Sequence, residues 1–258
     1  KEDLDPLYFM VFVKKQIELA ILGTGGMSQR YAALAASRPE FNLRIGFSSN
    51  EFRATRWENI VGTRCLSDIE LVAETSGIDM VVIASAPYQH EQHLNIFLDK
   101  GIPILCEKPL VTNLSMAEAI LKSAERRSIP VGCIFQKRLN TTTKLAKRFI
   151  TKNRESIRRV EVKLCLPRER AYYDCPTKGQ KTISGGGALI TQGIHGLDLL
   201  LYLFGKISKV KGEISNCYHR DIEVEDTAEI DIEFIDGIKA NFYVTTGMCE
   251  PNEEYKII

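Results

Sequence analysis

The chain has 258 residues, 44% hydrophobic and 26% charged, and its 34 Lys and Arg nearly balance its 33 Asp and Glu, giving a net charge of +1. This composition excludes a wholly disordered chain, and the neutral balance gives no electrostatic surface for nucleic acid or an anionic membrane. The seven cysteines are odd in number and include no CxxC pair, which excludes a regular disulfide framework and zinc-ribbon spacing and favours a reducing cytoplasm.

No apolar run approaches the ~20 residues needed to span a bilayer, so we predict no membrane association. The stretch 7–13 is too short for a span, follows acidic residues and lacks the small-residue cleavage site of a secretory signal. Met10 is a candidate native start.

The first half of the chain alternates short apolar runs with segments of helical periodicity. Strands are predicted at residues 17–22, 43–47, 79–84, 102–106 and 131–135, and helices at residues 28–37, 67–75, 90–100 and 115–127. Ser115 and Glu118 form a capping box for the last helix, and Gly101 follows the end of the one before it. Strand and helix in alternation predict βαβ units and a parallel, doubly wound α/β sheet.

The second half has a different pattern. Residues 160–164 and 230–234 alternate apolar and charged side chains, which predicts strands with one face in water and hence a mainly antiparallel open sheet. Asp236-Gly237 is a strong hairpin signal, and residues 144–150 look helical. We therefore predict an N-terminal extension at 1–16, a doubly wound domain at 17–136 and an α+β domain at 137–258.

A glycine-rich turn, Gly23-Thr24-Gly25-Gly26-Met27-Ser28, joins the first predicted strand to the first helix. In a G-x-G-x-x-[GAS] turn the first glycine allows the bend, the second lets backbone approach a pyrophosphate, and the third small position lets helix and strand pack closely. The helix N-terminus then offers N–H groups to the phosphates. The motif alone is weak, since such a turn is sometimes merely structural, but its context predicts a dinucleotide site of the Rossmann type.

The end of the second predicted strand indicates which dinucleotide binds. NAD-binding proteins place an Asp or Glu there for the ribose 2′-OH, whereas this chain has Ser48 and Ser49 followed by Arg53 and, one turn on, Arg56. Hydroxyl groups and a guanidinium suit a 2′-phosphate, so we predict NADP, with NAD as the alternative because Glu51 could take the ribose role. The plainer alternative is a helix start whose arginines face water.

Two loops follow later strands of the predicted sheet. Ligands of doubly wound sheets lie beyond the carboxyl ends of the strands, where Pro87 to His90 and Glu107-Lys108-Pro109 are expected. A desolvated Lys108 could stabilise a developing alkoxide, although a lone lysine in a loop is usually a solvated surface residue.

Residues 188–204 have helical apolar spacing and carry Thr191, His195, Asp198 and Tyr202 as one polar stripe. Such groups on a buried helix are either satisfied by partners or face a cavity. The alternative for His195 is a purely structural role, as a core histidine paired with Asp198. We predict no metal site, because the nearest candidate pair, His90 and His93, lacks further ligands and fits a surface-and-cap role better.

Together these motifs resemble the glucose–fructose oxidoreductase, inositol dehydrogenase and MocA family of NAD(P)-dependent oxidoreductases. The resemblance rests on the glycine turn at 23–28, Pro87 with His90, Glu107-Lys108-Pro109, the glycine-rich helix start through His195 and Asp198, and residues 223–228. It implies a Rossmann domain followed by an α/β domain whose open sheet often forms oligomer contacts, and a Lys–Pro bond that is often cis. Usual substrates are sugars, cyclitols and nucleotide sugars.

The resemblance also implies roles for individual residues. Lys108 corresponds to the catalytic lysine and His195 to the proton-transfer residue, with Thr191 binding substrate or positioning His195. The residues expected to contact the cofactor are Gly23, Thr24, Gly25, Gly26, Met27, Ser48, Ser49, Arg53, Ala86, Pro87, His90, Glu107 and Lys108.

Two departures from the family pattern stand out. Thr191 occupies the position where the family usually has Asp or Asn, and Thr carries no charge. The chain also ends at Ile258, earlier than typical members, so either the second sheet is trimmed or the C-terminus is missing.

We therefore predict an enzyme that transfers a hydride between NADP and a hydroxyl or keto carbon of a sugar, cyclitol or nucleotide sugar. The expected form is a cytoplasmic homo-oligomer, a dimer or tetramer. The alternatives are a non-catalytic NAD(P)-binding sensor of the same fold, which Thr191 favours, and a reductase of a non-sugar substrate. The loop 167–184 would set specificity, and its Arg168, Arg170, Tyr172, Tyr173 and Lys178 either bind a phosphate or uronate or face solvent.

Overall fold

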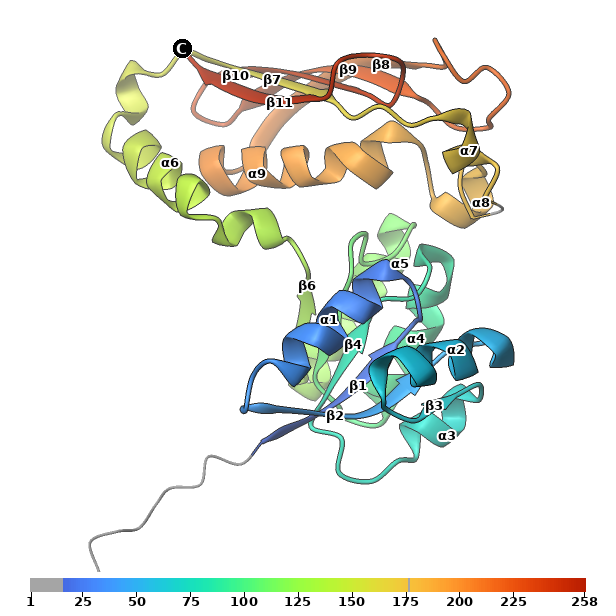
Figure 1. The fold of residues 1–258 in the computed structure, drawn as a ribbon. Coiled ribbons are helices and arrows are strands. Elements are labelled where there is room, and N and C mark those ends of the chain that lie inside the picture. Colours follow the sequence, from blue (N-terminus) through green and yellow to red (C-terminus); the bar gives the residue numbers. More distant parts are fainter. Residues whose placement is uncertain (1–15, 176) are drawn as a thin grey trace, which may run out of the picture. The chain divides into compact units, whose positions relative to one another are not determined.

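The computed structural model describes residues 16–175 and 177–258, which build two β-sheets with helices packed against them (Figure 1). The stretch 7–13, the candidate start at Met10 and all of the predicted N-terminal extension except Gln16 lie outside the described residues. The chain forms two compact units, one from residues 16–85 with 96–104 and the other from residues 86–95 with 105–258. The domain boundary after Gln136 remains a prediction.

The first sheet has six strands in the order β3-β2-β1-β4-β5-β6. Its strands are β1 (Ile17–Leu22), β2 (Phe41–Phe47), β3 (Cys65–Leu66), β4 (Met80–Ile83), β5 (Ile104–Cys106) and β6 (Val131–Cys133). β1 pairs in parallel with β2 and β4, and β2 with β3. Ile21, Leu22 and Ile83 are fully buried, as in parallel strands covered on both faces. The doubly wound prediction is confirmed; the two-residue β3 was not predicted.

Five helices accompany these strands: α1 (Gly26–Ala36), α2 (Glu51–Val61), α3 (Ile69–Ala73), α4 (Pro87–Asp99) and α5 (Leu114–Arg127). The capping box predicted for α5 is wrong. Asn113 is the N-cap, and its Oδ1 accepts hydrogen bonds from the amides of Ser115 and Met116 at 2.9 and 3.3 Å. Asn is among the strongest N-caps and stands earlier in the chain, so the helix begins at Leu114, before the predicted cap.

The second sheet has five strands in the order β11-β7-β10-β9-β8. Its strands are β7 (Arg159–Cys165), β8 (Ile207–Ser215), β9 (Thr227–Phe234), β10 (Lys239–Thr245) and β11 (Asn252–Ile257). All neighbours are antiparallel except β7 and β10, so the prediction of a mainly antiparallel sheet is confirmed with one parallel pair. The predicted hairpin joins β9 to β10, with Gly237 at φ 83° in the left-handed region.

One face of this sheet carries the apolar core, because alternate residues of each strand point toward the helices. Helix α9 (Ile194–Phe204) runs along that face, and α6 (Thr141–Lys152) packs nearby (Figure 1). The core residues include Val160, Val162, Leu164, Ile150, Leu200, Phe204, Phe234, Phe242 and Val244.

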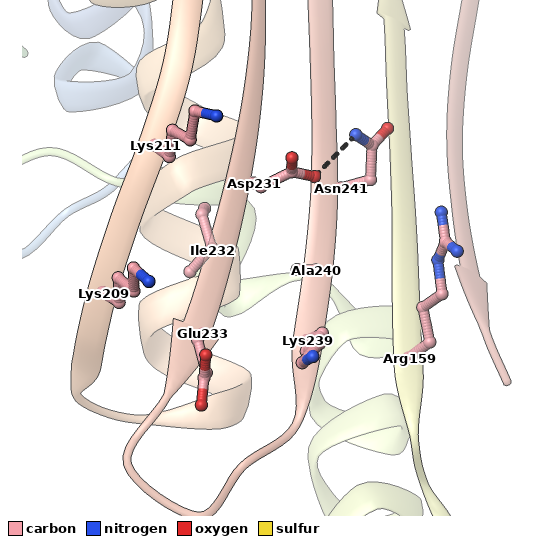
Figure 2. Close-up of a pocket in the computed structure, with 9 residues that line it drawn as sticks. All are labelled: Arg159, Lys209, Lys211, Asp231, Ile232, Glu233, Lys239, Ala240 and Asn241. Atoms are coloured by element: carbon pink, nitrogen blue, oxygen red, sulfur yellow. Dashed lines mark hydrogen bonds between the residues drawn. The ribbon is translucent and has the colours of Figure 1, made fainter.

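The other face of the second sheet is open and charged. Figure 2 shows a hollow on it lined by both signs, with lysines on β8 beside Asp231 and Glu233 on β9. Asn241 on β10 donates a hydrogen bond to Asp231 at 3.2 Å (Figure 2). This face buries no apolar core, as the charged positions of the two predicted strands indicated.

The helical segment predicted at 188–204 is present but not uniform. A π-helical turn, Leu189–Gly193, leads into α9, and the short helices α7 (Arg170–Tyr173) and α8 (Lys181–Ser184) precede it. Short 3₁₀ turns lie at Gln136–Leu139 and Arg154–Ser156.

Among the described residues, one helical stretch, Lys181–Phe204, is long and apolar enough to cross a membrane by length and composition alone. This stretch differs from the prediction that no apolar run reaches such a length. Half of the most apolar window is buried within the fold, and the core helix of a soluble protein meets the same criterion.

Candidate active site

The glycine-rich turn lies between β1 and α1 and needs glycine at its first position. Gly23 has φ 110°, and a Cβ there would come within 2.5 Å of the Ala84 carbonyl oxygen. A Cβ on Gly25 or Gly26 would meet nothing within 4 Å, so the turn has open space in front of the helix start. No side chain caps α1 at Gly25, which leaves the first N–H groups of the helix for an anion. These residues fit the pyrophosphate of a dinucleotide.

The third small position of the motif packs the helix against its neighbours. Ser28 is fully buried, and its hydroxyl accepts a hydrogen bond from Trp57 Nε1 at 2.7 Å. Trp57 comes from α2 and also lies against Gly46 of β2, where a Cβ would be 2.5 Å from the indole ring. A small residue is therefore needed at Ser28 because helix and strand pack closely there, as predicted.

Residues predicted to select NADP lie close to this turn. The Thr24 hydroxyl donates to the buried Ser48 hydroxyl at 3.3 Å. Thr24, Gly25, Arg53 and Arg56 line one hollow of about 300 Å³. An exposed guanidinium beside a hydroxyl pair suits a phosphate group. Ser49 is exposed and Met27 is half-buried in the same unit.

Lys108 follows β5 and precedes a cis peptide bond to Pro109, as the resemblance implied. Its Nζ donates a hydrogen bond to the Thr191 carbonyl oxygen at 2.7 Å, and its backbone N–H donates to Glu107 Oε2 at 3.1 Å. Burial lowers the pKa of the Lys108 ammonium, and the positive charges of Lys178 and Arg168 lower that pKa further, whereas Glu107 opposes the shift. The ammonium is thus desolvated and held at the start of the helix that carries His195.

His90 lies behind this loop. It is fully buried, and its Nδ1 donates a hydrogen bond to the Pro109 carbonyl oxygen at 2.8 Å. The same nitrogen lies 3.4 Å from the Cys106 sulfur. The imidazole therefore holds the Lys108–Pro109 segment, while its predicted contact with the cofactor, like those of Ala86 and Pro87, remains a prediction.

His195 sits in the first turn of α9 with a buried Nδ1 that has no hydrogen-bond partner among the described residues. Burial lowers the pKa of its imidazole to about 4, helped by the positive charges of Lys108 and Lys137 and opposed by Asp198 and Glu253. Phe135 meets the ring edge-on, with the centroids 6.1 Å apart. The imidazole is therefore neutral at pH 7, and its Nδ1 makes no hydrogen bond within the described part of the chain.

Asp198 does not satisfy His195. Its two carboxylate oxygens accept hydrogen bonds from Arg138, at 2.8 Å from Nε and 2.5 Å from Nη2. The alternative of a core histidine paired with Asp198 is therefore not observed. Arg138 was not predicted as part of the site, since the sequence marks it only as a charged residue shortly after the last strand of the first sheet.

Thr191 lies in the π-helical turn, where its hydroxyl donates to the Gly187 carbonyl oxygen at 2.7 Å. Its own carbonyl oxygen accepts a hydrogen bond from the Lys108 ammonium. The backbone of Thr191, rather than its side chain, thus makes the contact with the candidate catalytic lysine. Whether its hydroxyl touches substrate remains a prediction.

Comparison with known proteins agrees with these features. The family described as "Oxidoreductase family, NAD-binding Rossmann fold" matches residues 17–135, and the GFO/IDH/MocA C-terminal domain matches residues 156–258. The chain belongs to the GFO/IDH/MocA oxidoreductase family. The predicted family, and with it an oxidoreductase with a nicotinamide dinucleotide, is confirmed.

Two of the relatives that this chain matches are named as dehydrogenases. Glucose-6-phosphate 3-dehydrogenase of Bacillus subtilis is 24% identical over 92% of this chain and 69% of its own length. The scyllo-inositol 2-dehydrogenase (NADP(+)) IolU of the same organism is 27% identical over 76% of this chain and 60% of its own length. The chain thus spans about two thirds of these relatives.

Solved structures share the fold. The WlbA dehydrogenase of Bordetella pertussis, in complex with NADH and UDP-GlcNAcA, has a TM-score of 0.89 at 24% identity, covering 95% of this chain and 76% of that one. Levoglucosan dehydrogenase, in complex with NADH and levoglucosan, has a TM-score of 0.86 at 21% identity, covering 94% and 71%. At this identity the likeness establishes the architecture of the GFO/IDH/MocA family.

Proposed function

We propose that this chain transfers a hydride between NADP and a hydroxyl-bearing or keto carbon of a sugar-like substrate. The observation that carries the proposal is the hydrogen bond from Lys108 Nζ to the Thr191 carbonyl oxygen, because it fixes a desolvated ammonium at the start of the helix that presents His195. The names of the dehydrogenase relatives support a sugar or cyclitol substrate.

The cofactor supplies the hydride acceptor or donor when it is bound. The turn from Gly23 to Met27 would hold its pyrophosphate, and Ser48 with Arg53 would hold the 2′-phosphate. The name of one relative, an NADP(+)-dependent inositol dehydrogenase, agrees with this preference, whereas two structural neighbours contain NADH.

Lys108 and His195 have different roles at the substrate. The Lys108 ammonium stabilises negative charge that develops on the substrate oxygen. The neutral His195 imidazole accepts the hydroxyl proton during oxidation and returns it during reduction. Burial of both groups strengthens these interactions because water does not screen them.

The experiment titrates NADPH and NADH against the purified protein and then follows the nicotinamide absorbance with a panel of polyols, sugar phosphates and nucleotide sugars. We expect turnover that Lys108→Met and His195→Gln each abolish, with NADPH binding retained in His195→Gln. Binding of NADPH without turnover of any substrate would favour the sensor alternative, which Thr191 in place of the usual acid supports. Turnover of carbonyl compounds that are not sugars would favour the second alternative.

Arg53→Ala tests the preference for NADP. We expect NADPH binding to weaken much more than NADH binding, because the 2′-phosphate loses its guanidinium. Arg38→Ala, an exposed arginine outside this hollow, serves as the matched control. Equal losses for both cofactors would contradict the preference.

We further propose that the chain forms homo-oligomers through the open face of the second sheet and works in a reducing cytoplasm. Lysines on β8 beside acids on β9 make this face complementary to a second copy related by a twofold axis (Figure 2). Light scattering after gel filtration should give a dimer or tetramer that Asp231→Lys dissociates, with the exposed Glu125→Lys as control. A wild-type monomer would refute this assembly.

A further inference from the structure

A group of positive charges gathers near the candidate active site. Arg168 donates from Nη2 to Gln192 Oε1 at 3.0 Å, and Gln192 adjoins Thr191, whose carbonyl oxygen holds Lys108. Arg168 and Lys178 both lie over the ring of Tyr172, 5.4 and 5.5 Å from its centroid. The half-buried Arg168 and Lys178 thus share one aromatic platform.

In the described part of the chain, none of these cations forms an ion pair with a carboxylate. Among residues 16–175 and 177–258, no ion pair joins Arg168, Lys178 or Lys108 to an Asp or Glu within 4.0 Å. Among the described residues, Glu107 is the carboxylate whose charge acts on Lys108, and it accepts a hydrogen bond from that residue's backbone N–H.

The same loop shows the contrasting arrangement. Arg170, two residues after Arg168, forms ion pairs with Asp221 at 2.6 Å and Asp174 at 3.7 Å. The charge of Arg170 is therefore balanced by two aspartates. Arg168 instead contacts the neutral Gln192, so its charge is not balanced by an ion pair. Both Arg168 and Lys178 act on the Lys108 ammonium through their charge, which places them within electrostatic reach of it.

Like charges repel, so a partly buried group of three cations is costly unless an anion joins it. We propose that the substrate carries an anionic group, a carboxylate or a phosphate ester, which Arg168 and Lys178 bind beside Lys108. This inference rests on the proposed function and names the substrate class: an acidic sugar rather than a neutral polyol. The guanidinium provides two parallel donors and the ammonium a point charge, and Tyr172 fixes both.

The direct test needs no knowledge of the sugar. Inorganic phosphate and acetate are titrated by calorimetry against the full chain and against Arg168→Gln, Lys178→Gln and Arg170→Gln. We expect Arg168→Gln and Lys178→Gln each to weaken binding of at least one anion by roughly tenfold. The ion-paired Arg170→Gln should leave it unchanged. Anion binding to Arg53→Ala, measured in parallel, shows whether the anion binds at Arg168 and Lys178 or in the hollow near the glycine turn.

Comparison of the two anions distinguishes a uronate site, which binds acetate, from a phosphate-ester site, which prefers phosphate. Arg168→Lys keeps the charge and should retain most of the binding. If Arg168→Gln fails to fold, Lys178→Gln provides the same test. Absence of anion binding, or equal binding by all variants, would overturn the inference.

Turnover separates this inference from the proposed function. With D-glucose, D-glucuronate and D-glucose 6-phosphate as probes, a lower KM for the acidic sugars that Lys178→Gln abolishes would support both. Turnover of D-glucose alone, unaffected by Lys178→Gln, would keep the oxidoreductase and refute the anionic substrate. Anion binding at Arg168 without any turnover would keep the anion site and count against the enzyme.

Discussion

Arg138 and Asp198 form a two-point ion pair, with Nε and Nη2 of the guanidinium 2.8 and 2.5 Å from the two carboxylate oxygens. The side chain of Asp198 is 6% exposed and that of Arg138 is 43% exposed. Asp198 lies three residues after His195 on α9, and Arg138 engages both oxygens of its carboxylate. His195 keeps an unpaired Nδ1 in the part of the chain that the structure describes.

The ion pair predicts a loss of stability when Arg138 is removed. Arg138→Ala leaves a buried carboxylate without its partner, and because the half-exposed guanidinium already lies partly in water we expect the free energy of unfolding to fall by only about 1 to 2 kcal/mol. Urea denaturation measures this loss. Arg148→Ala, an exposed arginine on α6, should change stability by less than about 0.5 kcal/mol. Similar losses for both variants would show that the ion pair contributes nothing to the free energy of unfolding.

The environment of His195 predicts a low titration midpoint. NMR of its ring proton should give a pKa near the value of about 4 that burial and nearby cations impose. Lys108→Met removes a positive charge and should raise the pKa toward its ordinary range, and Lys137→Met should raise it less. Because oxidation needs the neutral imidazole, the acid limb of kcat/KM should lie well below pH 6.5. A wild-type midpoint near 6.5 would contradict both expectations.

His93 predicts a dependence of stability on pH. The side chain is 1% exposed, and burial, with a smaller effect of His90, lowers its pKa from 6.5 to about 4. Between these values the unfolded chain binds more protons than the folded chain, so stability is greatest above pH 6.5 and falls as the pH drops toward 4. Unfolding free energies from urea titrations should decrease by about 2 kcal/mol from this group between pH 7 and pH 5. His93→Gln should flatten the profile; an unchanged slope would assign it to other groups.

Gly25 allows nucleotide binding to be separated from folding. A Cβ at this position would meet nothing within 4 Å, and its φ of −77° suits any residue, so Gly25→Ala should unfold at the wild-type temperature. NADPH binding should weaken at least about tenfold, because a methyl group stands where backbone would approach the pyrophosphate. Gly23→Ala is the contrasting variant, since its Cβ would lie 2.5 Å from the Ala84 carbonyl oxygen, and it should lower the unfolding temperature. Unaltered NADPH affinity in Gly25→Ala would remove the turn from the cofactor site.

Five of the six strands of the first sheet were predictable because each contains a short apolar run; the two-residue β3 was not. Strands β8 and β11 were not, since they lie at the two edges of the second sheet, where β8 is exposed along almost its whole length and β11 half-buries only Tyr255 and Ile257. Edge strands need to bury little apolar surface, so their sequences carry only a weak period of two. Asn113 was missed as a cap because Ser115 and Glu118 satisfy the same pattern.

Within the candidate site, the sequence indicated Lys108 and His195, but not how they are held. The contact of Lys108 with a backbone carbonyl joins residues 83 positions apart, and the pair of Arg138 with Asp198 joins residues 60 apart. Spacing along one chain carries no information about such pairs, and a backbone acceptor leaves no side-chain signal at all. Thr191 illustrates this, since the sequence drew attention to its hydroxyl while the structure uses its carbonyl group.

The π-helical turn Leu189–Gly193 has a consequence for how this helix tolerates change in length. Such a turn holds one more residue than the α-helical turn it replaces, so loss of a single residue there restores ordinary helical geometry without breaking the backbone ladder. Each residue advances the helix by about 100°, so that deletion would rotate everything upstream, including the acceptor for Lys108, relative to His195. A deletion of one residue in this turn would therefore keep the helix but separate the Lys108 acceptor from His195. Homologous chains can thus differ in activity at this turn while they keep the same fold.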